Sequence, residues 1–409
     1  MYISALPGMT DWSIWKFKGI IMDYNKILSD KAVQIKPSGI RRYFDMADQY
    51  DDCISLGVGE PDFKTPWHIR QVGVDNLKHG STRYTANAGL LELRKSIRNY
   101  MDRRFGLPYD PDSQIVVTVG GSEGIDAIFR ALINPGDEIL IPQPSFVCYA
   151  PLAELADGIP VILPTYEQDQ FRLRPDIIQK AITSRTKILV MPYPNNPTGA
   201  VMTLQDYEAI ADIIKGTDII VLADEIYVEL TYTGCTPVSF AQASGMYDHT
   251  VIINGFSKAY AMTGWRMGYA CGPAPIIKQA LKIHQFGIMS APTTSQYAAI
   301  DALNNGDEDI QKMRDEYNMR RRYLYAAFRE MNIPCFEPLG AFYMFPNISQ
   351  FGMSSEEFCD RFLREKHVAV VPGTAFGNSG EGFLRISYAY SLDHLKKAMD
   401  RLQGFIKDK

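Results

Sequence analysis

A lysine followed eight residues later by an arginine is the pattern in this sequence with the most chemical promise. Lys258 comes just after the β-branched run at residues 250–254, which predicts a buried strand. A lysine at such a strand end lies where a sheet opens to ligand, and partial desolvation lowers its pKa towards the neutral, nucleophilic amine. That amine can form a Schiff base, and the planar guanidinium of Arg266 can bind a phosphate or a carboxylate. A single lysine of this kind is more often a solvated loop residue, so the rest of the chain has to support the assignment.

Strands and helices alternate through the middle of the chain. Apolar runs bounded by turn residues predict strands at residues 115–119, 138–141, 187–191, 218–223 and 250–254, and apolar periodicity predicts helices at 125–133 and 204–214. This alternation predicts an α/β fold with a mostly parallel sheet covered on both faces by helices. Ligands of such sheets bind outside the carboxyl ends of the strands. Five residues fall at those ends, which predicts one shared site: Gly121, Phe146, Asn196, Asp224 and Lys258.

Each of these positions also has an ordinary structural explanation. Gly121, Ser122 and Glu123 open a predicted helix whose free amides favour a phosphate, but a serine beside an acid is also a common helix cap. Phe146 could equally be a core residue. Asp224 ends an apolar run, so its carboxylate lies near buried surface and should need a cationic partner, although an aspartate at a strand end is common.

Three further candidates lie outside this alternating stretch. Glycines at 57 and 59 allow the backbone to approach a ligand closely, or they form a simple tight turn. Tyr84 is predicted to be a loop tyrosine. Arg385 interrupts an apolar strand pattern at residues 383–387, and a buried arginine needs an anion from the protein or from a substrate.

The chain is long enough for two domains. Residues 276–330 are rich in helix pattern and predict a long connector, and strands are predicted beyond it at 340–343, 368–371 and 383–387. Because no linker or low-complexity segment separates the parts, we expect tightly associated domains. The predicted division is an N-terminal extension at 1–21, a large domain at 58–300 and a small α+β domain formed by 22–57 and 301–409.

Composition argues against several classes of protein. The formal net charge is −5, with 42 basic and 47 acidic residues and no basic tract, so nucleic acid is not an expected partner. The 6 cysteines are scattered and the 6 histidines occur singly, so neither a disulfide framework nor a metal site is predicted. No window approaches the roughly eighteen apolar residues of a membrane span, and residues 1–21 lack the pattern of a signal peptide. A cytoplasmic location is expected.

Taken together, the motifs resemble the class I (fold type I) pyridoxal-phosphate aminotransferases, which share the fold of aspartate aminotransferase. The resemblance covers the chain from about residue 30 onwards. It is carried most specifically by Gly255-Phe256-Ser257-Lys258, by residues 261–266 and by 281–285 with 291–293, which look most like the bacterial branch of N-acetyl-diaminopimelate, aromatic and aspartate aminotransferases. The resemblance implies a seven-stranded sheet sandwiched by helices, pyridoxal 5′-phosphate as cofactor, and a homodimer with shared active sites.

The resemblance also implies roles around the cofactor ring. Lys258 would hold the cofactor as a Schiff base and, once displaced, carry the proton between the substrate α-carbon and the cofactor. Asp224 would pair with the pyridine nitrogen. Tyr227 and Asn196 would hydrogen-bond the phenolic oxygen, and Phe146 would stack on the ring.

At the phosphate, the resemblance implies Gly121, Ser122 and Glu123 at the helix N-terminus, with Arg266 as the charge partner. Glu123 would repel a dianion unless its side chain turns away and only its amide is used. Tyr84 would reach the phosphate bound to the neighbouring subunit.

The substrates follow from the same resemblance. Arg385 would bind the substrate α-carboxylate, with a backbone contact from Gly59. Relatives selective for dicarboxylates have an arginine in the segment that reads 285–288 here, where Phe286 cannot bind a distal carboxylate. A longer, acylated or aromatic amino acid is therefore favoured as donor, with 2-oxoglutarate as acceptor.

Two other activities stay open. The same scaffold supports β-elimination from cysteine conjugates. A regulatory protein that binds the cofactor without turnover would need a DNA-binding helix-turn-helix, for which residues 1–30 are too short and too weakly helical.

Overall fold

The computed structural model of the chain describes residues 23–37, 39–47 and 49–407. The chain divides into two compact units, Met1–Pro37 and Ser38–Lys409. In its described part the first unit has a 3₁₀ turn, η1 (Tyr24–Lys26), and a short helix, α1 (Asp30–Gln34). The predicted extension at 1–21 lies outside the described residues. The second unit contains the sheets.

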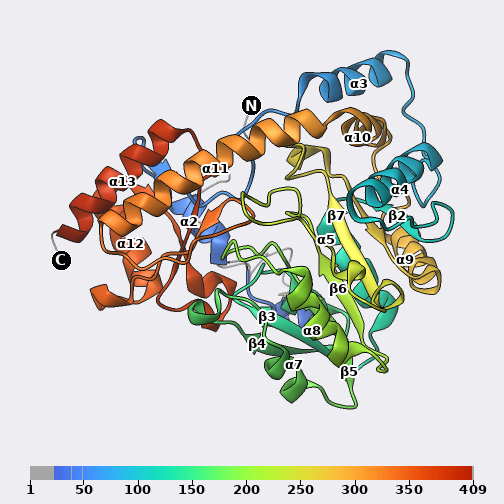
Figure 1. Cartoon of the computed structure of the whole chain (residues 1–409), viewed down its shortest axis with the longest axis horizontal. Coiled ribbons are helices and arrows are strands. Elements are labelled where there is room, and N and C mark those ends of the chain that lie inside the picture. Colours follow the sequence, from blue (N-terminus) through green and yellow to red (C-terminus); the bar gives the residue numbers. More distant parts are fainter. Residues whose placement is uncertain (1–22, 38, 48, 408–409) are drawn as a thin grey trace. The chain divides into compact units, whose positions relative to one another are not determined.

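The largest sheet has seven strands in the order β2-β8-β7-β6-β5-β3-β4 (Figure 1). They are β2 (Ile115–Thr118), β3 (Glu138–Gln143), β4 (Ile159–Pro164), β5 (Thr186–Met191), β6 (Ile220–Asp224), β7 (Thr250–Gly255) and β8 (Gly268–Cys271). β8 runs antiparallel to both of its neighbours, and the other pairs are parallel. The prediction of a mostly parallel, seven-stranded sheet is confirmed.

Helices cover both faces of this sheet because successive side chains of a strand point to opposite faces. On β5, Ile188 and Val190 join the core formed with α5 (Gly121–Leu132), α6 (Tyr149–Leu155) and α9 (Ala274–Gly287). Leu189 and Met191 join the opposite core, formed with α7 (Pro175–Ala181) and α8 (Leu204–Ile214). Three more helices lie towards the β2 end: α3 (Trp67–Lys78), α4 (Leu91–Phe105) and α10 (Thr293–Asn305).

The long helix α11 (Asp307–Glu330) leads from the large sheet to a second region (Figure 1). There a three-stranded sheet has the order β11-β12-β9, and a two-stranded sheet pairs β1 with β10. These strands are β1 (Ile54–Ser55), β9 (Tyr343–Met344), β10 (Val368–Ala369), β11 (Val371–Pro372) and β12 (Leu384–Ser387). They pack with α2 (Gly39–Ala47), α12 (Ser355–Lys366) and α13 (Leu392–Lys407).

Short 3₁₀ turns complete the second unit: η2 (Glu167–Asp169), η3 (Phe240–Gln242), η4 (Tyr247–His249), η5 (Thr263–Trp265), η6 (Ser349–Phe351), η7 (Gly373–Phe376) and η8 (Asn378–Gly380). None of the helices in the described ranges has the length and apolar character needed to span a bilayer.

The strand predicted at 340–343 was wrong in all but its last residue. The amide of Gly340 donates to the carbonyl of Gly199 and that of Ala341 to the carbonyl of Leu230, and Ala341 has a φ of 56°. The backbone there bonds to loops instead of to a neighbouring strand, so β9 starts only at Tyr343. The division into a large domain at 58–300 and a small domain formed by 22–57 and 301–409 stays a prediction. A small domain made of these two segments requires contacts between them, and the pairing of β1 with β10 is one such contact.

Candidate functional site

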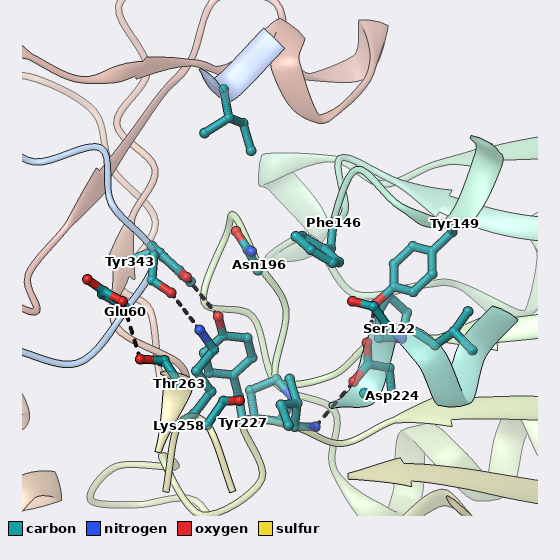
Figure 2. Close-up of a pocket in the computed structure, with 18 of the residues that line it drawn as sticks. Glu60, Ser122, Phe146, Tyr149, Asn196, Asp224, Tyr227, Lys258, Thr263 and Tyr343 are labelled. Atoms are coloured by element: carbon teal, nitrogen blue, oxygen red, sulfur yellow. Dashed lines mark hydrogen bonds between the residues drawn. The ribbon is translucent and has the colours of Figure 1, made fainter. Parts of the chain in front are cut away.

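A cavity of about 390 Å³ lies where the carboxyl ends of the parallel strands meet the three-stranded sheet (Figure 2). It brings together ten of the twelve residues predicted from the sequence: Gly59, Gly121, Ser122, Phe146, Asn196, Asp224, Tyr227, Lys258, Arg266 and Arg385. Glu123 and Tyr84 are not among its lining residues. Ile40, Val58, Glu60, Tyr149 and Tyr343 also line it and were not predicted.

Lys258 projects into the cavity from the turn that follows β7. Its Nζ donates a hydrogen bond of 2.5 Å to the carbonyl of Gly59 and lies 5.7 Å from the ring centroids of Tyr227 and Phe342. Burial lowers the pKa of Lys258 to about 8, assisted by the charge of Arg385. About a tenth of this amine is therefore neutral at pH 7, which is far more than for an ordinary lysine and supplies the form that a nucleophile or a base requires.

Asp224 is the last residue of β6 and faces the same cavity (Figure 2). Its Oδ2 accepts a hydrogen bond of 2.6 Å from the hydroxyl of Tyr149, and its Oδ1 accepts one from the amide of Ile226. Burial raises the pKa of Asp224, whereas both hydrogen bonds and the charge of Lys258 act in the opposite direction. No basic side chain in the described part of the chain forms an ion pair with Asp224, so the cationic partner expected from the sequence is not supplied by those residues.

Tyr149 was missed by the sequence analysis. It begins α6, three residues after Phe146, and is fully buried with its hydroxyl on Asp224. A buried tyrosine generally has a partner for its hydroxyl. Applied to the residues that follow β3, that rule could have identified Tyr149 as a tyrosine whose hydroxyl bonds to a polar group of the site.

Tyr227 and Tyr343 form a pair of buried phenols at the side of the cavity. Their hydroxyl oxygens are 2.7 Å apart, and their rings meet edge to face with centroids 5.8 Å apart (Figure 2). Burial raises the pKa of both. Tyr343 opens β9 and was read from the sequence only as part of an apolar strand, so its hydroxyl was overlooked.

Arg385 lies on β12 with 2% of its surface exposed. Its Nη1 donates to Oδ1 of Asn196 at 3.1 Å and its Nη2 to the carbonyl of Gly57. Its Nε has no partner among the described residues, and its Cζ lies 4.7 Å from the ring centroids of Tyr343 and Phe376. Burial lowers the pKa of Arg385. The arginine thus contacts neutral acceptors and rings, and it retains capacity to bind an anion in the cavity.

The N-terminus of α5 forms a close turn beneath Arg266. Gly120 has a φ of 79°, and a Cβ built on it would lie 2.6 Å from Nη2 of Arg266. The guanidinium itself donates to the carbonyls of Thr263 and Val119. Only a glycine at 120 leaves room for this approach, which places a cation beside the free amides of a helix start, an arrangement suited to phosphate.

Glu123 turns its carboxylate away from that turn. Its Oε2 accepts from the amide of Val119, and its Oε1 lies 3.1 Å from Nδ1 of His284, which is buried in α9. The condition set by the sequence analysis is therefore met, because the acid is engaged elsewhere and only the backbone of residue 123 remains at the helix start.

Tyr84 and Phe286 lie at the surface, with 83% and 88% of their area exposed. Phe286 is in the last turn of α9. The two segments are tied together, since Nδ2 of Asn87 donates to the carbonyl of Met289 at 2.8 Å. Contact between Tyr84 and the phosphate site of a neighbouring subunit stays a prediction.

The described residues include no group of three or more His, Cys, Asp or Glu side chains placed to hold a metal ion. None of the six cysteines, all of which lie within the described residues, forms a disulfide.

Comparisons with known proteins agree with this geometry. The family model for aminotransferase class I and II matches residues 51–402. YugH of Bacillus subtilis, whose name places it among the aminotransferases, is 48% identical over 93% of this chain and 98% of its own. Aromatic-amino-acid aminotransferase 2 of Thermococcus litoralis is 42% identical over 93% and 99% of the two chains. The structure of aspartate aminotransferase from Thermus thermophilus with maleate superimposes with a TM-score of 0.88 at 36% identity, covering 92% of this chain and 98% of that one.

Proposed function

The chain belongs to the class I and II aminotransferases, and from that premise we propose that it uses pyridoxal 5′-phosphate, bound covalently to Lys258, to transfer the α-amino group of an L-amino acid to a 2-oxo acid. The observation that carries the proposal is the meeting of Lys258, Asp224 and Arg385 in one cavity. They lie on or just after strands of two different sheets, and the burial of Asp224 and Arg385 and the partial burial of Lys258 carry a cost that a bound cofactor and substrate would offset.

The lining residues fit this cofactor at three points. The helix start at Gly121, with Arg266 beside it, suits a phosphate. The buried carboxylate of Asp224 suits a protonated ring nitrogen, which would be the cation that the described side chains do not provide. The unpartnered Nε of Arg385 suits a substrate carboxylate.

When bound, pyridoxal phosphate supplies an aldehyde carbon that bonds to an amine and a ring that takes up electrons from the substrate α-carbon. Lys258, with its pKa lowered to about 8, takes the proton from the α-carbon and returns it. Asp224 holds a proton on the ring nitrogen. Tyr227 and Asn196 would hydrogen-bond the phenolic oxygen, and Phe146 would cover one face of the ring.

Substrate recognition is assigned to Arg385 and to the lining beside it. The guanidinium binds the α-carboxylate, with Gly59 offering a backbone contact, and so orients the α-carbon toward Lys258. Ile40 and Val58 give the cavity apolar walls near Glu60. We propose a longer, acylated or aromatic amino acid as donor, because the apolar walls favour an apolar side chain. We propose 2-oxoglutarate as acceptor on the likeness to the aminotransferase family alone.

We also propose that the enzyme is a homodimer in which Tyr84 completes the phosphate site of the second copy. Support comes from large apolar side chains that are exposed on α3 and near Tyr84, namely Trp67, Leu77, Phe286 and Met289. Exposed apolar surface of this kind marks an interaction site.

A panel of amino acids tests the proposed function. The purified holoenzyme would be assayed for glutamate formation from 2-oxoglutarate with N-acetyl-diaminopimelate, phenylalanine and aspartate in turn. We expect turnover with at least one donor, and phenylalanine or N-acetyl-diaminopimelate to exceed aspartate. Release of pyruvate and ammonia from cystathionine without any acceptor, and no glutamate from any donor, would instead identify a β-lyase.

A further inference from the structure

Tyr343 lines the cavity but has no role in the mechanism described so far. It opens β9, which pairs antiparallel with β12 so that Tyr343 lies opposite Ser387, two residues from Arg385. Its side chain is completely buried, although it lines the cavity and carries a polar hydroxyl. A phenol in such a place is there for its packing, for its hydrogen bond, or for both.

Its contacts reach three of the assigned residues. The Tyr343 ring lies 4.7 Å from Cζ of Arg385, and its hydroxyl is 2.7 Å from that of Tyr227. The same hydroxyl lies 2.6 Å from where a Cβ on Gly59 would stand, and the Gly59 carbonyl accepts the hydrogen bond from Lys258. The Tyr343 side chain therefore lies against Arg385, Tyr227 and the backbone of Gly59, which accepts the hydrogen bond from Lys258.

The direction of the hydroxyl pair decides what Tyr227 can do. A hydroxyl has one proton, so Tyr227 can donate into the cavity only if Tyr343 donates to it. The positive charge of Arg385, 4.7 Å from the Tyr343 ring, opposes the rise in pKa that burial causes in both phenols. In Tyr343 this charge is the main opposing effect, whereas the neighbouring Tyr343 hydroxyl raises the pKa of Tyr227 further, so Tyr343 is the stronger donor of the two. A chain of donors then runs from Tyr343 through Tyr227 to the phenolic oxygen, and each bond strengthens the next.

Building on the proposed function, we propose that Tyr343 is a positioning residue: its hydroxyl directs the Tyr227 proton into the cavity, and its ring holds the Arg385 guanidinium in place. The two parts of the side chain have separable effects. Loss of the hydroxyl weakens the hydrogen bond to the phenolic oxygen, whereas loss of the ring disturbs carboxylate binding.

Tyr343→Phe tests the hydroxyl, with Tyr388→Phe as the matched control. Tyr388 is also fully buried in the same core, but its hydroxyl bonds to the carbonyl of Ala341 outside the cavity. The readout is the pH midpoint of the visible absorbance of the holoenzyme. A hydrogen bond donated to an anionic oxygen lowers the proton affinity of the linked lysine nitrogen, so Tyr343→Phe should raise the midpoint by about half a unit and Tyr227→Phe by more. A midpoint unchanged in Tyr343→Phe, or shifted equally in Tyr388→Phe, overturns the proposal.

Tyr343→Leu tests the ring. It should show the same shift of the midpoint and, in addition, a KM for the amino acid raised about tenfold, whereas Tyr343→Phe keeps KM within about twofold. Equal KM values for the two variants would refute the part of the proposal that concerns Arg385. Thermal melting of each variant identifies a failure to fold. If wild-type protein shows no visible absorbance with pyridoxal phosphate, the proposed function itself fails, and that outcome is distinct from an unshifted midpoint.

Discussion

The cavity has an acid end at Asp224 and an arginine end at Arg385. Each end buries a charged side chain, but the two side chains differ in their hydrogen-bond partners. At one end, Asp224 receives hydrogen bonds from Tyr149 and from a backbone amide, both contributed by the neighbourhood of the large sheet. At the other, Arg385 donates to Asn196 and to the carbonyl of Gly57, and its Nε has no acceptor in the part of the chain that the structure describes. Among the described residues, both carboxylate oxygens of Asp224 thus have hydrogen-bond donors but no cationic side chain, whereas the Arg385 guanidinium has one nitrogen without an acceptor. Such a contrast suits a permanent cofactor at the first end and a substrate that comes and goes at the second.

Removing the lysine that lies between the two ends should have the largest effect. Lys258→Ala takes away the residue proposed as both covalent anchor and base, so turnover should fall by at least about a thousandfold and the visible absorbance should disappear. Steady-state assays and absorbance spectra check this. Lys278→Ala, on the exposed side of α9, serves as the control and should behave as wild type. Retained activity in Lys258→Ala would remove the central assignment.

Neutralising the acid end should come next. Asp224→Asn keeps the shape of the side chain but removes its charge, so kcat should fall by roughly 10²–10³-fold and the cofactor should dissociate more readily. Dialysis followed by absorbance measures retention. The neighbouring Glu225 is also buried but bonds to Ser239 and Phe240 outside the cavity, and Glu225→Gln should leave kcat within about twofold. Similar losses in both variants would mean that burial, and not the position facing the cofactor, sets the effect.

The arginine end should respond through recognition of the carboxylate. Arg385→Leu should lower kcat/KM for amino acids about 100-fold, equivalent to roughly 3 kcal/mol, because a charge-assisted contact is lost. Amines that carry the same side chain as the amino acid but no carboxylate provide the internal control, and their kcat/KM should change little. An equal loss for both kinds of substrate would show that Arg385 does not bind the carboxylate.

The electrostatic state of Lys258 can be tested by pH. With its pKa lowered to about 8, the amine of the cofactor-free protein gains its neutral form as pH rises through 8. The rate at which added pyridoxal phosphate develops visible absorbance should therefore rise with a midpoint near 8. Rapid mixing between about pH 6 and 10 measures it. A midpoint close to that of an ordinary lysine would contradict the burial that distinguishes this position.

The smallest effect concerns Glu225 and the stability of the fold. Burial raises the pKa of Glu225 to about 8. An acid whose pKa is raised by folding stabilises the protein below its unfolded pKa, and this stabilisation is lost as pH rises through the folded value. The melting temperature of wild type should therefore fall relative to Glu225→Gln by about 2 °C or more between pH 5 and 8. A difference independent of pH would mean that Glu225 titrates normally.

The acid end was largely predictable from the sequence, because the carboxyl ends of parallel strands share one edge of a sheet. Asp224, Asn196 and Lys258 each follow an apolar run, and the strand order then brings them together. Tyr149 was not predictable in this way, since the side on which a helical residue points depends on how that helix is rotated against the sheet.

The arginine end was harder to predict. Arg385 was found because a charge interrupts an apolar strand, but its surroundings come from segments far apart in the chain. Tyr343 meets Tyr227 across 116 positions of sequence. In a strand rich in aromatic residues, a tyrosine used for its hydroxyl has the same pattern as one used for packing, so only the tertiary structure separates the two.

The antiparallel strand β8 has a practical consequence for redesign. Because it runs back alongside β7, residues 256–267 must reverse the chain, and this single connection carries both Lys258 and Arg266. The backbone at the end of this connection is closely packed, since a Cβ on Gly268 would lie 2.7 Å from the carbonyl carbon of Gly120. An insertion or deletion there would displace the amine and the guanidinium in one step. Engineers who want the enzyme to accept new amines should keep the length of this connection and mutate lining residues outside it, such as Ile40 and Val58.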